Sequence, residues 1–234
     1  MKKNELKLDK FIGGENLDLC IPTENFAEKS DWYTWFNNQN TTKYLEQGIY
    51  PNTKKEQKNF LNDSKKRIIL IIKKKYTDDY IGTISLSHIN HEKKICDIAL
   101  VLDFNKTYNL LTALESIALI TEHAFEKLGI KRISAGQHIK LKNWQKMMEL
   151  VGYKLEGIYI KKFIKGNEVS NSVSMSCLFE DYEKLKKIRG RLYDGNSSIM
   201  KRIRKKKKIT PYIDLLESFY KKQREIYYNK IFKL

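Results

Sequence analysis

The sequence has few cysteines, few prolines and no long apolar run. Its three cysteines, Cys20, Cys96 and Cys177, are far apart and have no metal-ligand spacing, so we expect neither a disulfide framework nor a metal site. An odd number of cysteines in a chain of this size favours a reducing compartment, and we predict a cytoplasmic protein. No stretch approaches the ~18 consecutive apolar residues of a transmembrane helix. The charged start, Met1–Glu5, leads us to expect no signal peptide.

Negative charge is also scarce. The chain has 45 Lys and Arg against 28 Asp and Glu, a net charge of +17. Such an excess predicts attraction to polyanions, which include nucleic acids, the phosphates of coenzyme A and anionic membranes, although solvated lysines are an equally good explanation. The 234 residues, 41% of them hydrophobic, suit one domain with a core plus an appendage.

The predicted elements indicate a mixed sheet with helices on both faces. Alternating and β-branched runs predict strands at 17–21, 68–72, 80–88, 95–102, 132–138, 153–164 and 173–178. Periodicity and end signals predict helices at 22–36, 53–66, 108–127 and 141–150. Thr53 and Glu56 have capping-box spacing, and Gly129 is a helix stop. This order of elements is not that of a doubly wound parallel sheet.

The composition changes near residue 190. Residues 191–234 hold 13 basic and 4 acidic side chains, a net +9. We predict a loop at 190–198, a cationic run at 201–208 that stays in water, and a final amphipathic helix that begins at Thr210 and Pro211. The chain is therefore divided into a domain at 1–189 and a basic C-terminal tail at 190–234 that is not part of the core.

Four segments, taken in order, carry a family resemblance. They are Ile81–Leu86, Cys96–Leu102, Ala124–Ile130 and Glu149–Tyr153. Together they resemble the GNAT superfamily of acetyl-CoA-dependent N-acetyltransferases, especially the branch that includes the ribosomal-protein N-terminal acetylases. The resemblance covers about 17–182. It implies an α/β (α+β) fold with a mixed, mostly antiparallel central sheet, and acetyl-CoA as co-substrate.

The resemblance implies a cofactor site at the start of the third predicted helix. In the family, the preceding strand presents backbone groups to the pantetheine arm, and a turn of the form Q/R-x-x-G-x-G/A holds the pyrophosphate at the helix N-terminus. This turn aligns with 108–113, where Ala113 fits, Tyr108 replaces Gln or Arg, and Leu111 replaces glycine. Either a divergent working site or a fold that has lost the site fits this departure. The implied cofactor-binding residues are Leu100, Leu102, Lys106, Thr107, Tyr108, Asn109, Leu110, Leu111, Thr112, Ala113 and Asn143.

The resemblance also implies a general base near the cofactor. Asp97 occupies the position of the glutamate in the family text A-E-I-G, and an acid in an apolar run is a candidate base because burial favours its protonated form. His138, at the end of a predicted strand, is the second candidate, since histidine titrates in the range that base catalysis needs. Both residues also suit structural roles. No tyrosine in 140–150 is available as the general acid.

The acceptor pocket is expected between the first helices and the last hairpin. Its predicted residues are Trp32, Tyr44, Glu46 and His88, although aromatic side chains there also suit helix packing.

Three functions remain open. The first is N-acetylation of a small amine, such as a nucleotide-linked amino sugar in surface-polysaccharide synthesis, from a likeness at 135–138 and 141–145. The second is protein N-terminal acetylation. The third is a non-catalytic binding module whose basic tail contacts nucleic acid or a membrane.

Overall fold

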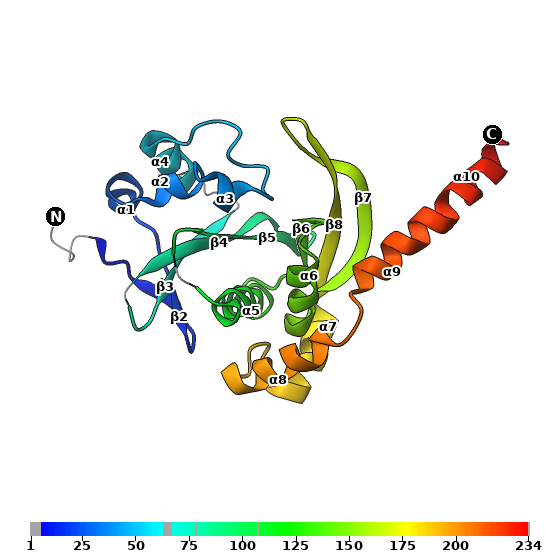
Figure 1. Ribbon diagram of the computed structural model, residues 1–234. Helices are drawn as coiled ribbons and strands as arrows, with labels where there is room; N and C mark the ends of the chain where they lie inside the picture. The colour runs from blue at the N-terminus through cyan, green and yellow to red at the C-terminus, as the bar shows by residue number, and fades with distance from the viewer. Residues whose placement is uncertain (1–5, 63–66, 78, 107, 234) are drawn as a thin grey trace.

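The computed structural model describes residues 6–62, 67–77, 79–106 and 108–233 (Figure 1). Its strands are β1 (Lys10–Gly13), β2 (Leu17–Cys20), β3 (Ile68–Lys74), β4 (Tyr80–Asn90), β5 (Ile95–Leu102), β6 (Arg132–His138), β7 (Lys154–Lys165) and β8 (Glu168–Leu178). Its helices are α1 (Glu24–Lys29), α2 (Trp32–Trp35), α3 (Gln39–Thr42), α4 (Lys54–Asn62), α5 (Leu110–Glu126), α6 (Lys142–Met148), the 3₁₀ turn η2 (Glu149–Val151), α7 (Phe179–Arg189), α8 (Asn196–Lys207), α9 (Tyr212–Phe219), the π-helical turn η3 (Tyr220–Arg224) and α10 (Glu225–Phe232).

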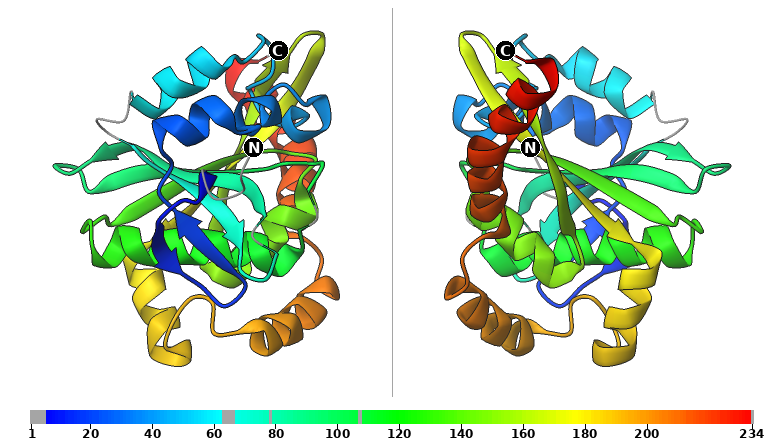
Figure 2. Two further views of the ribbon diagram at one scale, coloured as in Figure 1. Left: turned by 90° about the vertical axis from the view of Figure 1, so that its left-hand side faces the viewer. Right: turned by 90° about the vertical axis from the view of Figure 1, so that its right-hand side faces the viewer.

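The strands form one eight-stranded sheet in the order β1-β2-β3-β4-β5-β6-β8-β7. Every neighbouring pair is antiparallel except β5 and β6, which run parallel. Helices α1 to α4 lie on one face of the sheet, and α5 and α6 lie on the other (Figures 1 and 2). The predicted α/β (α+β) fold, with a mostly antiparallel mixed sheet covered on both faces, is confirmed.

Each face of the sheet has its own hydrophobic cluster. Ile84 and Ile98 pack with Ile117 of α5 in the main core. On the opposite face, Ile71 packs with Trp35 of α2 in a second, smaller cluster. The period-two alternation of the strands divides their side chains between these two layers.

The helix ends follow local capping chemistry. At the start of α4, the Thr53 hydroxyl accepts from the Glu56 N–H (3.2 Å) and the Glu56 carboxylate accepts from the Thr53 N–H (2.7 Å), which is the predicted capping box. Helix α5 begins at Leu110, two residues later than predicted, because Asn109 is extended and its side chain caps the helix. Gly129 follows the helix end with a φ of +67°.

The helix predicted at 22–36 is wrong as a continuous element, because it is broken at Ser30. This residue adopts an extended conformation that ends α1, and its hydroxyl accepts from the Trp32 N–H (3.1 Å) at the start of α2. Strand β1 and helix α7 were not predicted. Strand β1 pairs with β2 at the edge of the sheet and is mostly exposed, so it lacks the apolar signal of a buried strand.

The expectation that residues after 190 stay outside the core is wrong. Leu192, Tyr193, Ile199 and Ile203 are all at most 3% exposed and belong to the main core. Helix α8 places its two isoleucines, four positions apart, on one buried face and carries most of its cations on the other. Mutual repulsion of the cations does not prevent the helix, because most of them remain in water and Arg202 and Lys206 pair with Asp194 and Glu149. A separate role for 190–234 stays a prediction.

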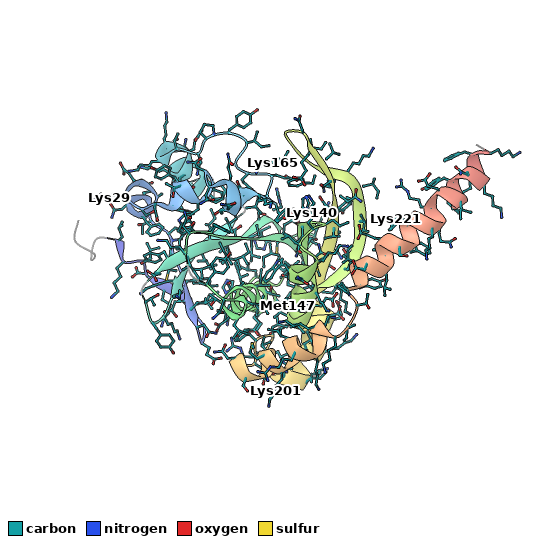
Figure 3. All side chains as sticks on the ribbon, in the orientation of Figure 1. Lys29, Lys140, Met147, Lys165, Lys201 and Lys221 are labelled. Carbon is teal, nitrogen blue, oxygen red and sulfur yellow. The ribbon has the colours of Figure 1, made fainter. Side chains whose placement is uncertain are left out.

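The last part of the chain projects from the domain. Helices α9 and α10 and the turn η3 continue one another, and Figure 3 labels Lys201 on α8 and Lys221 on this projecting helix. Its base is fixed by Lys142, whose Nζ lies 2.6 Å from carboxylate oxygens of both Asp214 and Glu217. Within the described residues, no helix has the length and apolar character needed to cross a bilayer.

Candidate functional site

The parallel pair β5 and β6 forms a fork in the middle of the sheet. The two strands pair only at their first residues, in the register Ile95–Arg132, Cys96–Ile133 and Asp97–Ser134. Beyond this point β5 stays with β4 and β6 stays with β8. The edge of β5 from 98 to 102 therefore has no partner strand among the described residues, and its backbone groups border the fork. The side chains of Leu100 and Leu102 pack against the main core.

One face of the sheet around the fork carries small and polar side chains. The strand register places Ser87, Asp97 and Ser134 side by side on this face. Ala99 and Gly136, near its centre, are exposed. We call this surface the serine face. Its other members are Ser85, Ser172, Ser174 and Ser176.

Asp97 lies on the serine face at the point where the strands separate, and it contacts His88. Asp97 Oδ2 lies 2.9 Å from His88 Nδ1. The side chains are 50% and 78% exposed, respectively, so the expected burial of Asp97 is not found. His88 has a φ of +51° and lies in the irregular part of β4 between Ser87 and Asn90. Positive φ is uncommon for a residue with a Cβ and is often found at functional sites.

His138 is on the same face but is enclosed. Its side chain is 0% exposed, and its ring lies 4.9 Å from the ring of Tyr44 and 4.5 Å from that of Phe163. Nδ1 accepts from the Lys140 N–H (3.1 Å), which assigns the proton to Nε2, 3.3 Å from Glu168 Oε1. Burial lowers the pKa of His138 despite the opposing effect of Glu168. The neutral ring therefore has no free lone pair with which to accept a proton.

A lysine joins the two sides of the acceptor region. Lys165, at the tip of the β7–β8 hairpin, donates through Nζ to the carbonyl oxygens of Thr42 (2.8 Å), Leu45 (3.3 Å) and Gln47 (2.7 Å) (Figure 3). Burial lowers the pKa of this ammonium group. The contacts hold the segment that carries Tyr44 against the hairpin.

The start of α5 contains the predicted phosphate turn. Leu111, which replaces the family glycine, is partly buried and packs against the main core. Ala113 is buried as well. Asn109 Oδ1 accepts from the N–H (2.9 Å) and the hydroxyl (3.0 Å) of Thr112, so this backbone amide already has a partner.

The remaining predicted cofactor residues surround the same turn. Tyr108 and Leu110 are 39% and 37% exposed. Lys106 Nζ lies 3.6 Å from a carboxylate oxygen of Asp31. Asn143 is exposed on the first turn of α6. Thr107 lies outside the described residues.

Two residues that were predicted to line the acceptor pocket, Trp32 and Glu46, do not lie on the serine face. Trp32 is 0% exposed and belongs to the cluster beneath α1 to α4, so it has no surface for a ligand. Glu46 lines a separate hollow between α4 and the loop that follows α3. The structure does bring Tyr44 to His138 and His88 to Asp97.

The serine face itself was missed in the sequence, although a signal was present. Residues 170–177 read S-N-S-V-S-M-S-C, a period-two alternation that places hydroxyl groups on one side of a strand. Near Asp97 this face also carries an ion pair. Arg132 Nη1 donates to Glu156 Oε1 (2.7 Å), and the same oxygen accepts from the Ser176 hydroxyl (2.7 Å).

Comparison with known proteins identifies the family and the fold. The model of the acetyltransferase (GNAT) domain family matches residues 24–154. Spermidine N-acetyltransferase from Vibrio cholerae, solved with CoA and spermine, has a TM-score of 0.64 at 16% identity over 72% of this chain and 98% of that one. The microcin C7 self-immunity acetyltransferase MccE, solved with acetyl-CoA and AMP, has a TM-score of 0.61 at 20% identity, covering 76% and 100%.

A GCN5-related N-acetyltransferase from Brucella melitensis has a TM-score of 0.62 at 16% identity, with 78% of this chain and 84% of that chain covered. No curated protein matches the sequence. At these identities the structural likeness shows the fold, whereas the family model covers more than half of the chain. The chain belongs to the GNAT acetyltransferase family and is an acyltransferase of that class.

Proposed function

We propose that this protein transfers the acetyl group of acetyl-CoA to the amino group of a small molecule, with Asp97 as the general base. The observation that carries the proposal is the position of Asp97, a solvent-accessible carboxylate at the point where β5 and β6 separate. Family membership supports acetyl-CoA as the co-substrate. The assignment to the ribosomal-protein branch stays a prediction.

The residues around the fork fit acetyl-CoA. The unpaired edge of β5 offers backbone groups to the pantetheine arm, and the start of α5 offers the positive end of a helix dipole to the pyrophosphate. Leu111 packs against the main core, which leaves room for a phosphate at the turn in this proposal, and Lys106, which pairs with Asp31, precedes the turn in the sequence. These features favour a working site over one that the fold has lost.

Amine acetylation requires a neutral nucleophile, because an ammonium group has no lone pair. Asp97 takes a proton from the acceptor ammonium, while His88 donates through Nδ1 to Oδ2 and holds the carboxylate in place. A backbone N–H of the β5 edge polarises the thioester carbonyl. The amine nitrogen forms a bond to the carbonyl carbon, the C–S bond breaks, and the coenzyme A thiolate leaves and takes up a proton from water. We exclude His138 from the role of base in this proposal because its ring is enclosed and its Nδ1 lone pair is used.

The serine face supports a hydroxyl-rich acceptor such as a nucleotide-linked amino sugar. Serine hydroxyls both donate and accept hydrogen bonds, as sugar hydroxyls require. Tyr159, opposite Ser172 in the register, is 48% exposed and offers an aromatic face. The three cysteines are buried and free, in keeping with our prediction that the protein acts in the cytoplasm.

A binding module is the candidate of another class, and the exposed cations of α8 favour it. Helix α8 presents Lys201, Arg204 and Lys205 to solvent. A nucleic acid bound there would dissociate steeply with added salt.

Acetylation of a matched set of acceptors tests the proposal. We expect turnover with a nucleotide-linked amino sugar or its free amino sugar, and none with the corresponding N-acetyl sugar. Peptides with free N-termini are the comparison, and their preferential acetylation would establish the N-terminal alternative. If no amine in either group is acetylated while the chain binds RNA or anionic vesicles, the binding-module alternative replaces the proposal.

A further inference from the structure

A hollow of about 470 Å³ lies between α4 and the loop that follows α3. Its volume is in the range of small-molecule sites. Asp97 and the rest of the serine face are not among its lining residues, so it is separate from the proposed acetyl-transfer site. The lining residues used below are Phe36, Glu46, Tyr50, Glu56, Gln57 and Phe60.

Gln57 supplies a buried hydrogen-bond donor to this hollow. The residue is 1% exposed, and its Oε1 accepts from Asn52 Nδ2 (2.8 Å). The Asn52 side-chain amide is itself oriented, because its Nδ2 also donates to the backbone carbonyl oxygen of Tyr33 (3.3 Å). The Gln57 amide therefore cannot be turned over without facing one NH₂ group with another.

The Nε2 group of Gln57 has no hydrogen-bond partner among the described residues. A buried donor without an acceptor destabilises the folded chain, because it has lost its hydrogen bonds to water. Because Gln57 lines the hollow, a carbonyl or hydroxyl oxygen of a bound molecule can supply this acceptor. This unsatisfied donor points to a ligand, since the surrounding side chains leave it unpaired.

The charged residues that line the hollow determine which sign of charge a ligand should carry. Its charged lining residues are two carboxylates, Glu46 and Glu56, in a chain whose net charge is +17. Glu56 uses Oε2 to cap α4, whereas Glu46 is exposed at the rim. An ammonium group is therefore favoured beside Glu46, while the guanidinium group of Arg67 lies over the Phe60 ring, 4.6 Å from its centroid.

The aromatic residues that line the hollow favour a ligand that carries an apolar group. Phe36 and Phe60 contribute rings, and Phe60 is 36% exposed. Tyr50, beside them, is 84% exposed. An aromatic or branched apolar group would cover these rings and remove apolar surface from water.

We propose that this hollow is a second binding site, for a primary ammonium compound that carries an aromatic or branched apolar group and a carbonyl oxygen. The carbonyl accepts from Gln57 Nε2, the ammonium group lies near Glu46, and the apolar group packs on Phe60 and Tyr50. The site binds the compound without reacting with it.

Calorimetric titration of the full chain with L-phenylalaninamide tests the site. We expect one saturable binding event that Asp97→Asn leaves unchanged, and weaker binding of N-acetyl-L-phenylalaninamide, which lacks the positive charge. Gln57→Met should weaken binding by about tenfold through loss of one hydrogen bond. Glu46→Gln should weaken it by about threefold, whereas Glu92→Gln, in the exposed β4–β5 turn, should have no effect.

The surface variant Tyr50→Ala keeps the test decisive if Gln57→Met does not fold, because the Tyr50 side chain is mostly exposed. This variant should also weaken binding. Absence of binding to the wild-type chain at millimolar ligand would overturn the proposal. So would binding that is lost in Asp97→Asn but unchanged in Glu46→Gln and Tyr50→Ala, which would place the ligand on the serine face. Absence of binding would leave the acetyl-transfer proposal untouched, because Asp97 does not line the hollow.

Discussion

A chain that ends at Gly190 is expected not to fold. Truncation there removes Leu192, Tyr193, Ile199 and Ile203 from the main core. Each large apolar side chain contributes about 1.5–3 kcal/mol when it is buried, so the four together contribute roughly 6–12 kcal/mol. This is comparable to the whole free energy of unfolding of a typical domain, about 5–15 kcal/mol. Circular dichroism and thermal melting of the truncated chain measure the effect.

The matched control is a chain that ends at Ser218. It keeps α8 and the contacts of Lys142 with Asp214 and Glu217. None of the residues it removes, within the described chain, is buried. We expect a cooperative transition close to that of the full chain. A folded, cooperatively melting chain that ends at Gly190 would show that α8 is dispensable and that the predicted boundary at 190 holds.

Asp97→Asn is expected to lower kcat by about 10²–10⁴, because the amide cannot accept the proton of the acceptor ammonium. Its shape is close to that of the carboxylate, so the affinity for acetyl-CoA should not change. Steady-state kinetics over a range of pH, together with direct titration of acetyl-CoA, separate the two quantities.

Two further variants serve as comparisons for Asp97→Asn. His88→Gln removes the imidazole but leaves the carboxylate, and we expect a loss below about tenfold. Glu92→Gln, in the exposed turn between β4 and β5, should have no effect on the rate. Full activity of Asp97→Asn with the wild-type pH profile would clear Asp97 of this role. A loss in His88→Gln as large as in Asp97→Asn would indicate that the imidazole accepts the proton.

The fold was predictable because its signals are local and strong. The β-branched run of β3, the capping box of α4 and the glycine after α5 each indicate an element without knowledge of its neighbours. Helix α8 was not predictable in this way. Its two isoleucines are outnumbered by lysines and arginines, and only the packing of Leu192 and Tyr193 beside them shows that one face is buried.

In the candidate site, too, features with a local sequence signal were predictable and features that depend on strand pairing or packing were not. Asp97 was predicted from the family resemblance and from its place in an apolar strand, and its role stays a prediction. Its contact with His88 depends on an irregularity in β4 that has no clear local signal. Trp32 was placed in the acceptor pocket because of its residue type, whereas the fold places it in a dry cluster. The serine face was overlooked because its members come from four strands, and pairing brings them together.

The most direct test of the central claim, that this chain uses acetyl-CoA, is a titration of acetyl-CoA monitored by thermal unfolding. Binding to the fork is predicted to stabilise the folded chain by about 2.7 kcal/mol when acetyl-CoA is at 100 times its Kd. The stabilisation should be retained in Asp97→Asn, which alters the chemistry and not the cofactor site. A melting temperature that does not change up to millimolar acetyl-CoA, for a chain that is folded, would contradict the account and favour a GNAT fold without a working cofactor site.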